Sequence, residues 1–401
     1  AGAFRGGLAP VARRRGSGPC RTVPRGGGAM RRRGVCCLAC LASPPVLWAA
    51  LVAAVRKLRP ADVWVLKMAV PWAFADEVPM PPDDMAPVEL PRPLPAVDLP
   101  GGGRMPMSGL GLCCRLSALG GDVTRSVLWY LLLGGRHLDT AEVYNNHRAV
   151  GEGVRLAMAR GVPREAIFVT TKLPPSLFGG ESVAAWTSSM LSELGLDYVD
   201  LVLLHSPGDP PGAGAPFGIM RMPEACGGGD RRRCRAETWA ALSSARDRGL
   251  VRNVGISNFG PRQAGDLLAL GAAPIAVNQL EYHPWVPQKH RDTVTWCHRH
   301  GIAVVAYCSM GGPESVEAAT AHEAVRKLAA RHERTSGQIL LRWALQHNVS
   351  IIPGTGKHKH MKENLAVHDF ALDIAEMAEI DAQPALVAHR SYVVQEPDSA
   401  E

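Results

Sequence analysis

The sequence predicts an α/β fold, a (β/α)8 TIM barrel, preceded by a disordered or targeting N-terminal extension. From residue 105 onward, short β-rich apolar runs alternate with helix-like segments, and there are eight such runs in about 300 residues. A chain of 401 residues with 46% apolar and 5% aromatic side chains also has enough apolar material for a core of that size. Both observations favour one large domain after the extension.

The eight predicted strands are short, apolar and bounded by polar or glycine-containing segments. In chain order they are SGLGL (108–112), RHLDT (136–140), IFVTTKL (167–173), DYVDLVLLH (197–205), LVRNVGIS (250–257), IAVNQLE (275–281), IAVVAYCS (302–309) and VSIIPGT (349–355). Helices are predicted between them, for example SVAAWTSSMLSELG, which ends at Gly195, and SGQILLRWALQHN, which begins at Ser336.

A doubly wound dinucleotide-binding fold is the main architectural alternative. That fold requires the pattern GxGxxG directly after its first strand, because the third glycine allows close packing of helix on strand. The corresponding segment GLGLCC has Gly109 and Gly111, but Cys114 stands where the third glycine belongs. The sequence therefore favours the barrel.

The N-terminal extension divides into segments of different composition. Residues 1–29 are rich in Gly and Arg and are predicted to be disordered; residues 30–57 place three arginines before the 22 uncharged residues 34–55 and resemble a signal, transit or membrane-anchor segment. A proline-rich linker, residues 58–103, is expected to be extended and solvated, with few contacts to the barrel. The barrel is assigned to residues 104–390 and a tail to residues 391–401.

The charge distribution bears on location and on partners. The net charge is +7, but residues 1–60 carry 12 Arg or Lys and no Asp or Glu, which leaves 32 basic and 37 acidic residues for the remainder. A basic segment on a mildly acidic body favours targeting to an organelle or the secretory pathway over a nucleic-acid surface. We expect no nucleic-acid partner, a monomeric barrel, and membrane contact, if any, through residues 34–55; without targeting the protein would be cytoplasmic.

The ten cysteines do not form a regular disulfide framework. Cys113, Cys114, Cys297 and Cys308 lie in segments predicted to be buried, where cysteine is usually a small core residue. Only Cys226 and Cys234 share a polar loop, and a disulfide between them requires an oxidising compartment. No second ligand pair has the spacing of a zinc site, and we expect no metal.

Polar side chains gather at the carboxyl ends of the predicted strands, where TIM barrels carry out their chemistry. Each alone has a structural explanation, such as a solvated rim lysine or a packed tyrosine, but their placement on successive strand ends indicates an active site. These residues are Asp139, Tyr144, Lys172, His205, Ser257, Asn258, Gln279 and Tyr307.

Several motifs in register resemble the aldo-keto reductase family, over about residues 105–382. They are HLDTAxxY, LGLDYVDLVLLHSP, VRNVGISNF, AVNQLEYHPW, and IIPGTG followed by KENL. The resemblance implies a catalytic tetrad of Asp139, Tyr144, Lys172 and His205, with Tyr144 as the proton donor for hydride reduction of an aldehyde or ketone. A tyrosine ordinarily has a pKa near ~10, and an adjacent ammonium such as that of Lys172 lowers it.

The same resemblance implies a nicotinamide cofactor, NADPH with some use of NADH. It places Tyr307 on the nicotinamide ring and Ser257, Asn258 and Gln279 on the carboxamide. Around the 2′-phosphate, Gly354 and His360 replace the lysine and arginine usual in the family, which puts the usual NADPH preference in question. The remaining residues predicted at the cofactor's adenosine end are Thr355, Lys357, Lys359, Glu363 and Asn364.

The predicted substrate pocket also departs from the family pattern. Cys113, Pro174 and Ser206 stand where aromatic residues often line it, which predicts a roomier, less aromatic pocket. The leading hypothesis is an enzyme, an NAD(P)H-dependent aldo-keto reductase acting on a small carbonyl substrate. The alternative is a catalytically idle cofactor-binding barrel that senses redox state or regulates a membrane partner. All four tetrad side chains are present, and an idle domain has no chemical reason to keep them together.

Overall fold

The computed structural model describes residues 78–90, 92–113, 121–208 and 221–383. Every described residue belongs to one compact unit within residues 59–401. The predicted segments 1–29 and 30–57, the first part of the linker and the tail 391–401 lie outside the described residues.

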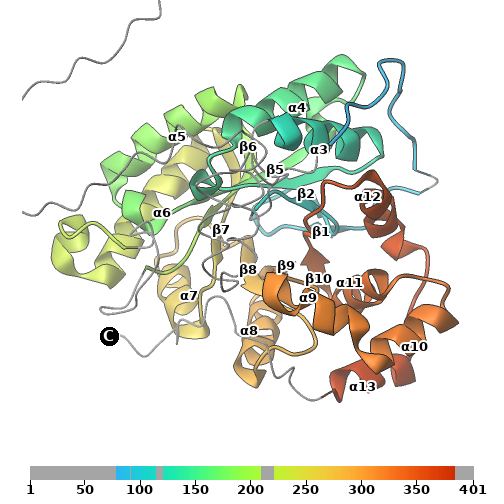
Figure 1. The fold of residues 1–401 in the computed structure, drawn as a ribbon. Helices are drawn as coiled ribbons and strands as arrows, with labels where there is room; N and C mark the ends of the chain where they lie inside the picture. Colours follow the sequence, from blue (N-terminus) through green and yellow to red (C-terminus); the bar gives the residue numbers. More distant parts are fainter. Residues whose placement is uncertain (1–77, 91, 114–120, 209–220, 384–401) are drawn as a thin grey trace, which may run out of the picture. The chain divides into compact units, whose positions relative to one another are not determined.

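A sheet of eight parallel strands forms the centre of the fold, in the order in which the strands occur along the chain (Figure 1). The sheet closes on itself because the Gly109 amide donates to the Ile351 carbonyl and the Ile351 amide donates to the Met107 carbonyl, both at 2.8 Å. All eight predicted strands are confirmed, and the fold is the predicted barrel. The strands are β3 (Leu110–Gly111), β4 (His137–Asp139), β5 (Phe168–Leu173), β6 (Val199–Leu204), β7 (Val251–Ser257), β8 (Val277–Glu281), β9 (Ala303–Tyr307) and β10 (Val349–Ile351).

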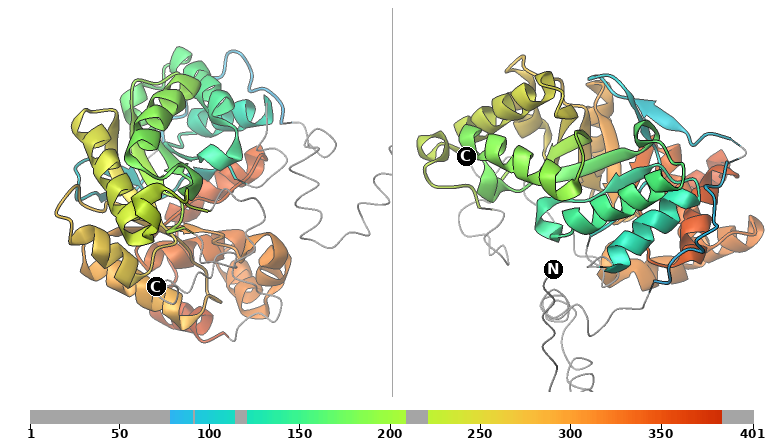
Figure 2. Two further views of the ribbon diagram at one scale, coloured as in Figure 1. Left: turned by 90° about the vertical axis from the view of Figure 1, so that its left-hand side faces the viewer. Right: turned by 90° about the horizontal axis from the view of Figure 1, so that it is seen from above.

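Helices follow the strands and surround them (Figure 2). α5 ends where Gly195 adopts a left-handed conformation with φ 62°, as expected for a C-terminal glycine. α11 begins after Thr335, whose hydroxyl accepts from the Gln338 amide in a capping box. The helices are α3 (Gly121–Leu132), α4 (His147–Ala159), α5 (Gly180–Leu194), α6 (Arg231–Asp247), α7 (Pro261–Leu268), α8 (Gln288–Arg299), α9 (Gly312–Ala321), α10 (Glu323–Arg331), α11 (Ser336–Gln346), α12 (His358–Leu365) and α13 (Ile374–Asp381).

Strand alternation separates two apolar layers. On β6, Leu201 and Leu203 belong to a small cluster inside the barrel, whereas Val202 and Leu204 belong to the larger cluster between strands and helices. Because Lys172 of β5 pairs in register with Leu203, its side chain lies on the inner face, and the neighbouring Thr171 lies on the outer face. This alternation brings the polar site residues to the interior.

The proline-rich segment is mostly exposed and has no helix or strand in residues 78–90, as predicted, but its contacts with the barrel correct our expectation of few contacts. In residues 78–90, the Pro79 carbonyl accepts from the Trp129 indole at 2.7 Å, and the Val88 amide donates to the Leu132 carbonyl at 2.7 Å. An antiparallel hairpin of β1 (Ala96–Asp98) and β2 (Arg104–Pro106) then places the fully buried Met105 in the inner cluster. These residues are part of the folded unit.

Candidate active site

The structure brings the four predicted tetrad residues together inside the barrel. The Lys172 ammonium donates to Asp139 Oδ1 at 2.6 Å, to the Thr140 carbonyl at 3.0 Å and to the Tyr144 hydroxyl at 3.2 Å. His205 packs edge-on against the Tyr144 ring, with 5.9 Å between ring centroids. The predicted cluster is therefore a contiguous group of side chains.

Each tetrad side chain owes its position to a different element. Asp139 ends β4, Lys172 lies next to the end of β5, and His205 follows β6, so three of them come from the carboxyl ends of adjacent strands. Tyr144 ends the short 3₁₀ helix η4 (Glu142–Tyr144), which turns back over the mouth after β4. Parallel pairing of β4, β5 and β6 in register sets the spacing of the group.

Burial governs the electrostatics of the site. Burial lowers the pKa of the Lys172 ammonium, but the Asp139 carboxylate and Tyr144 outweigh it and raise that pKa above its ordinary value. Burial raises the pKa of the Tyr144 phenol, against the opposing effect of Lys172. Burial and Lys172 together lower the pKa of His205 to about 3. At neutral pH the site therefore holds a charged lysine, a protonated phenol and a neutral imidazole.

The predicted nicotinamide-binding residues form a hydrogen-bonded group beside the tetrad. The Tyr307 hydroxyl donates to Asn258 Oδ1 at 2.8 Å, and Asn258 Nδ2 donates to the His205 carbonyl at 3.0 Å and to Ser257 Oγ at 3.1 Å. Gln279 Nε2 donates to Asp139 Oδ2 at 2.7 Å. The Gln279 amide therefore forms a hydrogen bond with the tetrad itself. We predicted that Gln279 binds the carboxamide and did not predict this bond.

The predicted phosphate end lies at the start of α12. The Thr355 hydroxyl accepts from the Lys357 amide at 3.0 Å and lies 3.4 Å from His360 Nδ1. Lys359 Nζ is 3.7 Å from Glu363 Oε1. Lys357, Lys359 and His360 are exposed, whereas Glu363 and Asn364 are half-buried. Three cationic or titratable side chains therefore stand together at an exposed edge, and Gly354 beside them adds no side chain.

The predicted substrate residues adjoin the tetrad along the chain. Pro174 follows Lys172 by two residues, and Ser206 follows His205 directly; both side chains are buried. Cys113, just after β3, is half-buried and disulfide-bonded, which corrects its interpretation as a core thiol. Of the other cysteines interpreted as buried, Cys297 is buried and free, and Cys308 is free but half-buried.

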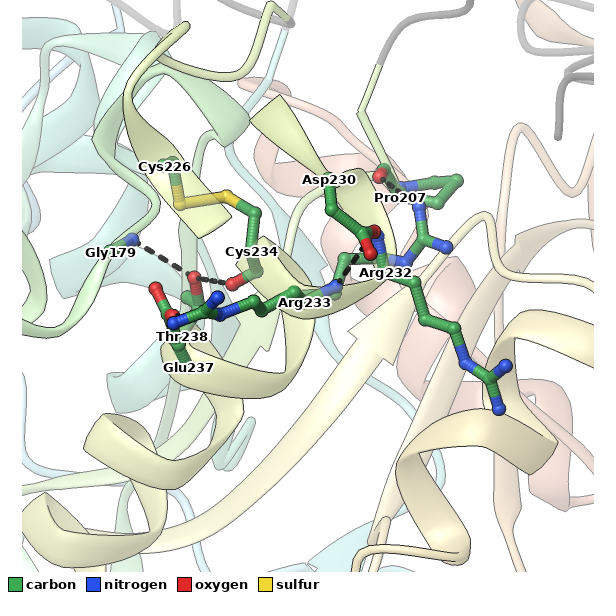
Figure 3. The surroundings of a disulfide bond; sticks show 10 residues. Gly179, Pro207, Cys226, Asp230, Arg232, Arg233, Cys234, Glu237 and Thr238 are labelled. Atoms are coloured by element: carbon green, nitrogen blue, oxygen red, sulfur yellow. Dashed lines mark hydrogen bonds and ion pairs between the residues drawn. A yellow bond between two sulfur atoms is a disulfide. The ribbon is translucent and has the colours of Figure 1, made fainter. Parts of the chain in front are cut away.

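Cys226 and Cys234, the pair for which the sequence allowed a disulfide, are disulfide-bonded in the structure (Figure 3). The disulfide joins η7 (Cys226–Gly229) to the first turn of α6. Thr238 Oγ1 donates to the Cys234 carbonyl at 2.7 Å and accepts from the Gly179 amide at 2.9 Å (Figure 3). The disulfide therefore lies close to Gly179, in the segment that follows β5.

Two features that the described residues lack bear on the alternatives. Nowhere in residues 78–383, apart from the undescribed gaps, do three His, Cys, Asp or Glu side chains gather as a metal site would require. Among the helices in the same part of the chain, none combines the length and the apolar character that a membrane span requires. The apolar run 34–55 lies outside that part.

Sequence reasoning missed the side chains that support the tyrosine. The Thr140 hydroxyl bonds Asn146 Oδ1, and Asn146 Nδ2 donates to the Leu112 carbonyl at 3.1 Å. His147 is buried, and its Nε2 lies 2.8 Å from Thr171 Oγ1. The only available signal was the density of polar residues in the segment TAEVYNNH, which by itself suggests a solvated loop.

Comparison with known proteins identifies the class. The sequence model of the Aldo/keto reductase family matches residues 122–383. Aldo-keto reductase family 1 member A1 of Cricetulus griseus is 34% identical, over 73% of this chain and 90% of that protein. The NAD(P)H-dependent D-xylose reductase I,II of Candida tropicalis is 31% identical, over 72% of this chain and 93% of that protein.

Solved structures agree with the sequence comparison. The crystal structure of a Bombyx mori aldo-keto reductase in complex with NADP superimposes with a TM-score of 0.65 and 29% identity, covering 76% of this chain and 96% of that chain. The chain belongs to the aldo/keto reductase family of oxidoreductases.

Proposed function

We propose that this protein reduces an aldehyde or ketone to an alcohol with a reduced nicotinamide cofactor, and that Tyr144 is the proton donor. The observation that carries the proposal is the 3.2 Å contact between the Tyr144 hydroxyl and Lys172 Nζ, with Lys172 held by Asp139 at 2.6 Å. A buried ammonium beside a phenol stabilises the phenolate that forms when the proton leaves. The group is thus suited to general acid catalysis.

The neutral His205 has a separate task. With its pKa lowered to about 3, the imidazole stays uncharged at neutral pH and offers one N–H. Beside Tyr144, that N–H can donate to a carbonyl oxygen and orient it toward the phenol. Two donors would then converge on one oxygen, and only the more acidic of them, Tyr144, would transfer a proton.

The side chains beside the tetrad suit a nicotinamide cofactor. The amides of Asn258 and Gln279 and the hydroxyl of Ser257 offer both donors and acceptors to a carboxamide, and the Tyr307 ring offers an aromatic face. When bound, the cofactor supplies the hydride. The phosphate of NADPH would be held by Lys357, Lys359 and His360. Because Gly354 has no side chain to add to these contacts, the preference for NADPH would be modest and NADH would also be used.

The test is a screen of initial rates. Aliphatic and aromatic aldehydes and ketones are offered with NADPH or NADH, and oxidation of the cofactor is followed by its absorbance. We expect reduction of at least one carbonyl class, with NADPH as the better cofactor. If the protein binds NADPH in a fluorescence titration yet reduces none of the carbonyls, the proposal is wrong and the idle-barrel hypothesis takes its place.

A further inference from the structure

His147 lies outside the tetrad but connects the elements that carry it. It begins α4, three residues after Tyr144, and its side chain is 2% exposed. Its Nε2 lies 2.8 Å from Thr171 Oγ1, and its Nδ1 lies 3.6 Å from Glu142 Oε2 and 3.5 Å from Glu193 Oε2. One buried imidazole therefore contacts side chains of η4, β5 and α5.

The contact of His147 with Thr171 lies on the face of β5 opposite to the contact of Tyr144 with Lys172. Thr171 precedes Lys172 on β5, and successive side chains of a strand point to opposite faces. Inside the barrel, the Tyr144 hydroxyl contacts Lys172 Nζ at 3.2 Å; outside it, His147 contacts Thr171 at 2.8 Å. The tyrosine segment is thus held to β5 at two points, one on each face of the strand.

The carboxylates hold the imidazole in place and fix the turn that carries the tyrosine. Glu142 belongs to the same 3₁₀ turn as Tyr144, and its Oε2 also accepts from the Trp186 indole of α5 at 2.8 Å. Glu193 also faces Arg148, whose side chain is 83% exposed, at 3.6 Å. Burial lowers the pKa of His147, while Glu142 and Glu193 oppose that shift.

The chemistry of a neutral imidazole suits this position. It has one N–H and one lone pair, so it can donate from Nδ1 toward the carboxylates and accept at Nε2 from the Thr171 hydroxyl. An aliphatic side chain would break both links and leave the Thr171 hydroxyl and the carboxylates without this partner. A glutamine retains a donor and an acceptor on a side chain of comparable reach.

We propose that His147 is a positioning residue that holds the Tyr144 hydroxyl against Lys172 by binding Thr171 on the outer face of β5. This inference rests on the proposed function, in which Tyr144 is the proton donor. Besides Lys172, the groups that face the Tyr144 phenol are Asp139, His205, Cys308 and Tyr307. His147 contacts none of them in the described hydrogen bonds and ion pairs, so its removal acts on the phenol through the geometry of the turn.

The experiment compares full-length His147→Leu and His147→Gln with the parent. The phenol pKa of Tyr144 is measured in the unliganded protein by NMR of ¹³C-labelled tyrosine, with Tyr144→Phe identifying the resonance. In His147→Leu we expect this pKa to rise, because Lys172 is farther away, and kcat to fall about 10- to 100-fold with an unchanged Kd for NADPH. In His147→Gln both quantities should return most of the way to the parent values.

Arg148→Leu is the matched control, since Arg148 is the next residue of α4, faces the same Glu193 and is exposed. It should leave the phenol pKa and kcat unchanged. If His147→Leu does not fold, Thr171→Val cuts the same contact from the other side with little change of shape, and the same measurements apply to it.

The inference is overturned if either folded variant loses thermal stability but keeps the phenol pKa and kcat of the parent, because His147 would then be only structural. It is also overturned if His147→Leu and His147→Gln are equally impaired. A parent that reduces no carbonyl contradicts the proposed function instead, and the phenol titration still decides the role of His147.

Discussion

The acidity of the Tyr144 hydroxyl results from two opposed effects. Lys172 lowers the phenol pKa, as expected from the resemblance to reductases, but burial outweighs it, and the net shift is upward. The phenol is therefore protonated at neutral pH, which is the state that a proton donor needs. In the proposed reaction, Lys172 would contribute most after the proton has left, when it stabilises the phenolate.

Replacing Tyr144 with phenylalanine removes only the hydroxyl and tests this role directly. General acid catalysis typically contributes about 10² to 10⁴ in rate, so turnover should fall by at least the lower figure. Affinity for the cofactor should stay nearly intact, because the ring and its packing against His205 remain. Steady-state rates and a fluorescence titration with NADPH provide the two measurements. Near-normal turnover with unchanged affinity would refute the tetrad assignment.

The preference for NADPH over NADH is also expected to depend on single residues, those at the predicted phosphate end. Charge-assisted hydrogen bonds to phosphate are each worth roughly 1.5 to 3 kcal/mol. His360 is exposed, and Lys359 is already 3.7 Å from Glu363. Because Gly354 supplies no side chain, we predict a modest preference for NADPH with detectable use of NADH.

The measurement is kcat/KM for both cofactors, with His360→Ala compared to the parent. The variant should lose part of the preference for NADPH. If NADPH is preferred by orders of magnitude, and the variant behaves as the parent does, then Lys357 and Lys359 hold the phosphate without His360.

At the scale of elements, strand pattern was the most informative feature of the sequence. All eight strands were predictable because both faces of a barrel strand are covered, which produces short continuous apolar runs such as IFVTTKL. The end of α5 was predictable because Gly195 follows a known helix-end preference, and the start of α11 at Ser336 was predictable because a capping residue, Thr335, precedes it.

The parts that could not be predicted depend on contacts distant in sequence. Proline lacks a backbone donor but keeps its carbonyl, and the carbonyls of Pro79 and Pro82 accept from Trp129 and Arg160 of the helix layer. Composition alone could not reveal those partners. Likewise, the bond from Gln279 to Asp139 joins residues 140 positions apart, and only the closed barrel brings them together.

The docked segment leads to a prediction about truncation. A chain beginning near residue 100 should melt several degrees below a chain beginning at Val78. The cut near residue 100 removes β1 and Leu99, which packs in the inner cluster, and the contacts to Trp129 and Leu132. Thermal unfolding of both chains measures the difference. Equal melting temperatures would show that residues 78–99 contribute little, as the solvated-linker expectation required.

The disulfide is a second element whose contribution can be isolated. Its partners are eight residues apart, and closing a loop of that size in the unfolded chain is worth roughly 2 to 3 kcal/mol in the chain-entropy model. We predict that a reductant destabilises the parent by about that much more than it destabilises a Cys226→Ala, Cys234→Ala double variant. The double variant also controls for reduction of the disulfide at Cys113. Equal effects of the reductant on both proteins would show that this bond contributes nothing.

At the scale of the whole molecule, closing the barrel buries histidines that are uncharged in the folded state. Burial lowers the pKa of His137 to about 4 and that of His205 to about 3, and burial together with Arg342 lowers the pKa of His368 to about 4. In the unfolded chain, histidine takes up its proton near pH 6.5. Between those values the unfolded state binds more protons than the folded state, so acid favours unfolding.

The direction in which stability changes with pH follows from that difference in bound protons. The contribution of these three histidines to stability is fully present above about pH 6.5 and is lost as the pH falls toward 4. At one pH unit below 6.5, each histidine costs about 1.4 kcal/mol, so the free energy of unfolding should drop by roughly 4 kcal/mol between pH 7.5 and 5.5. Urea unfolding at the two pH values measures the drop. His137→Gln should reduce it by about a third. A drop of the same size in His137→Gln and in the parent would mean that this histidine does not exclude the proton, and that the acid sensitivity of the barrel has another source.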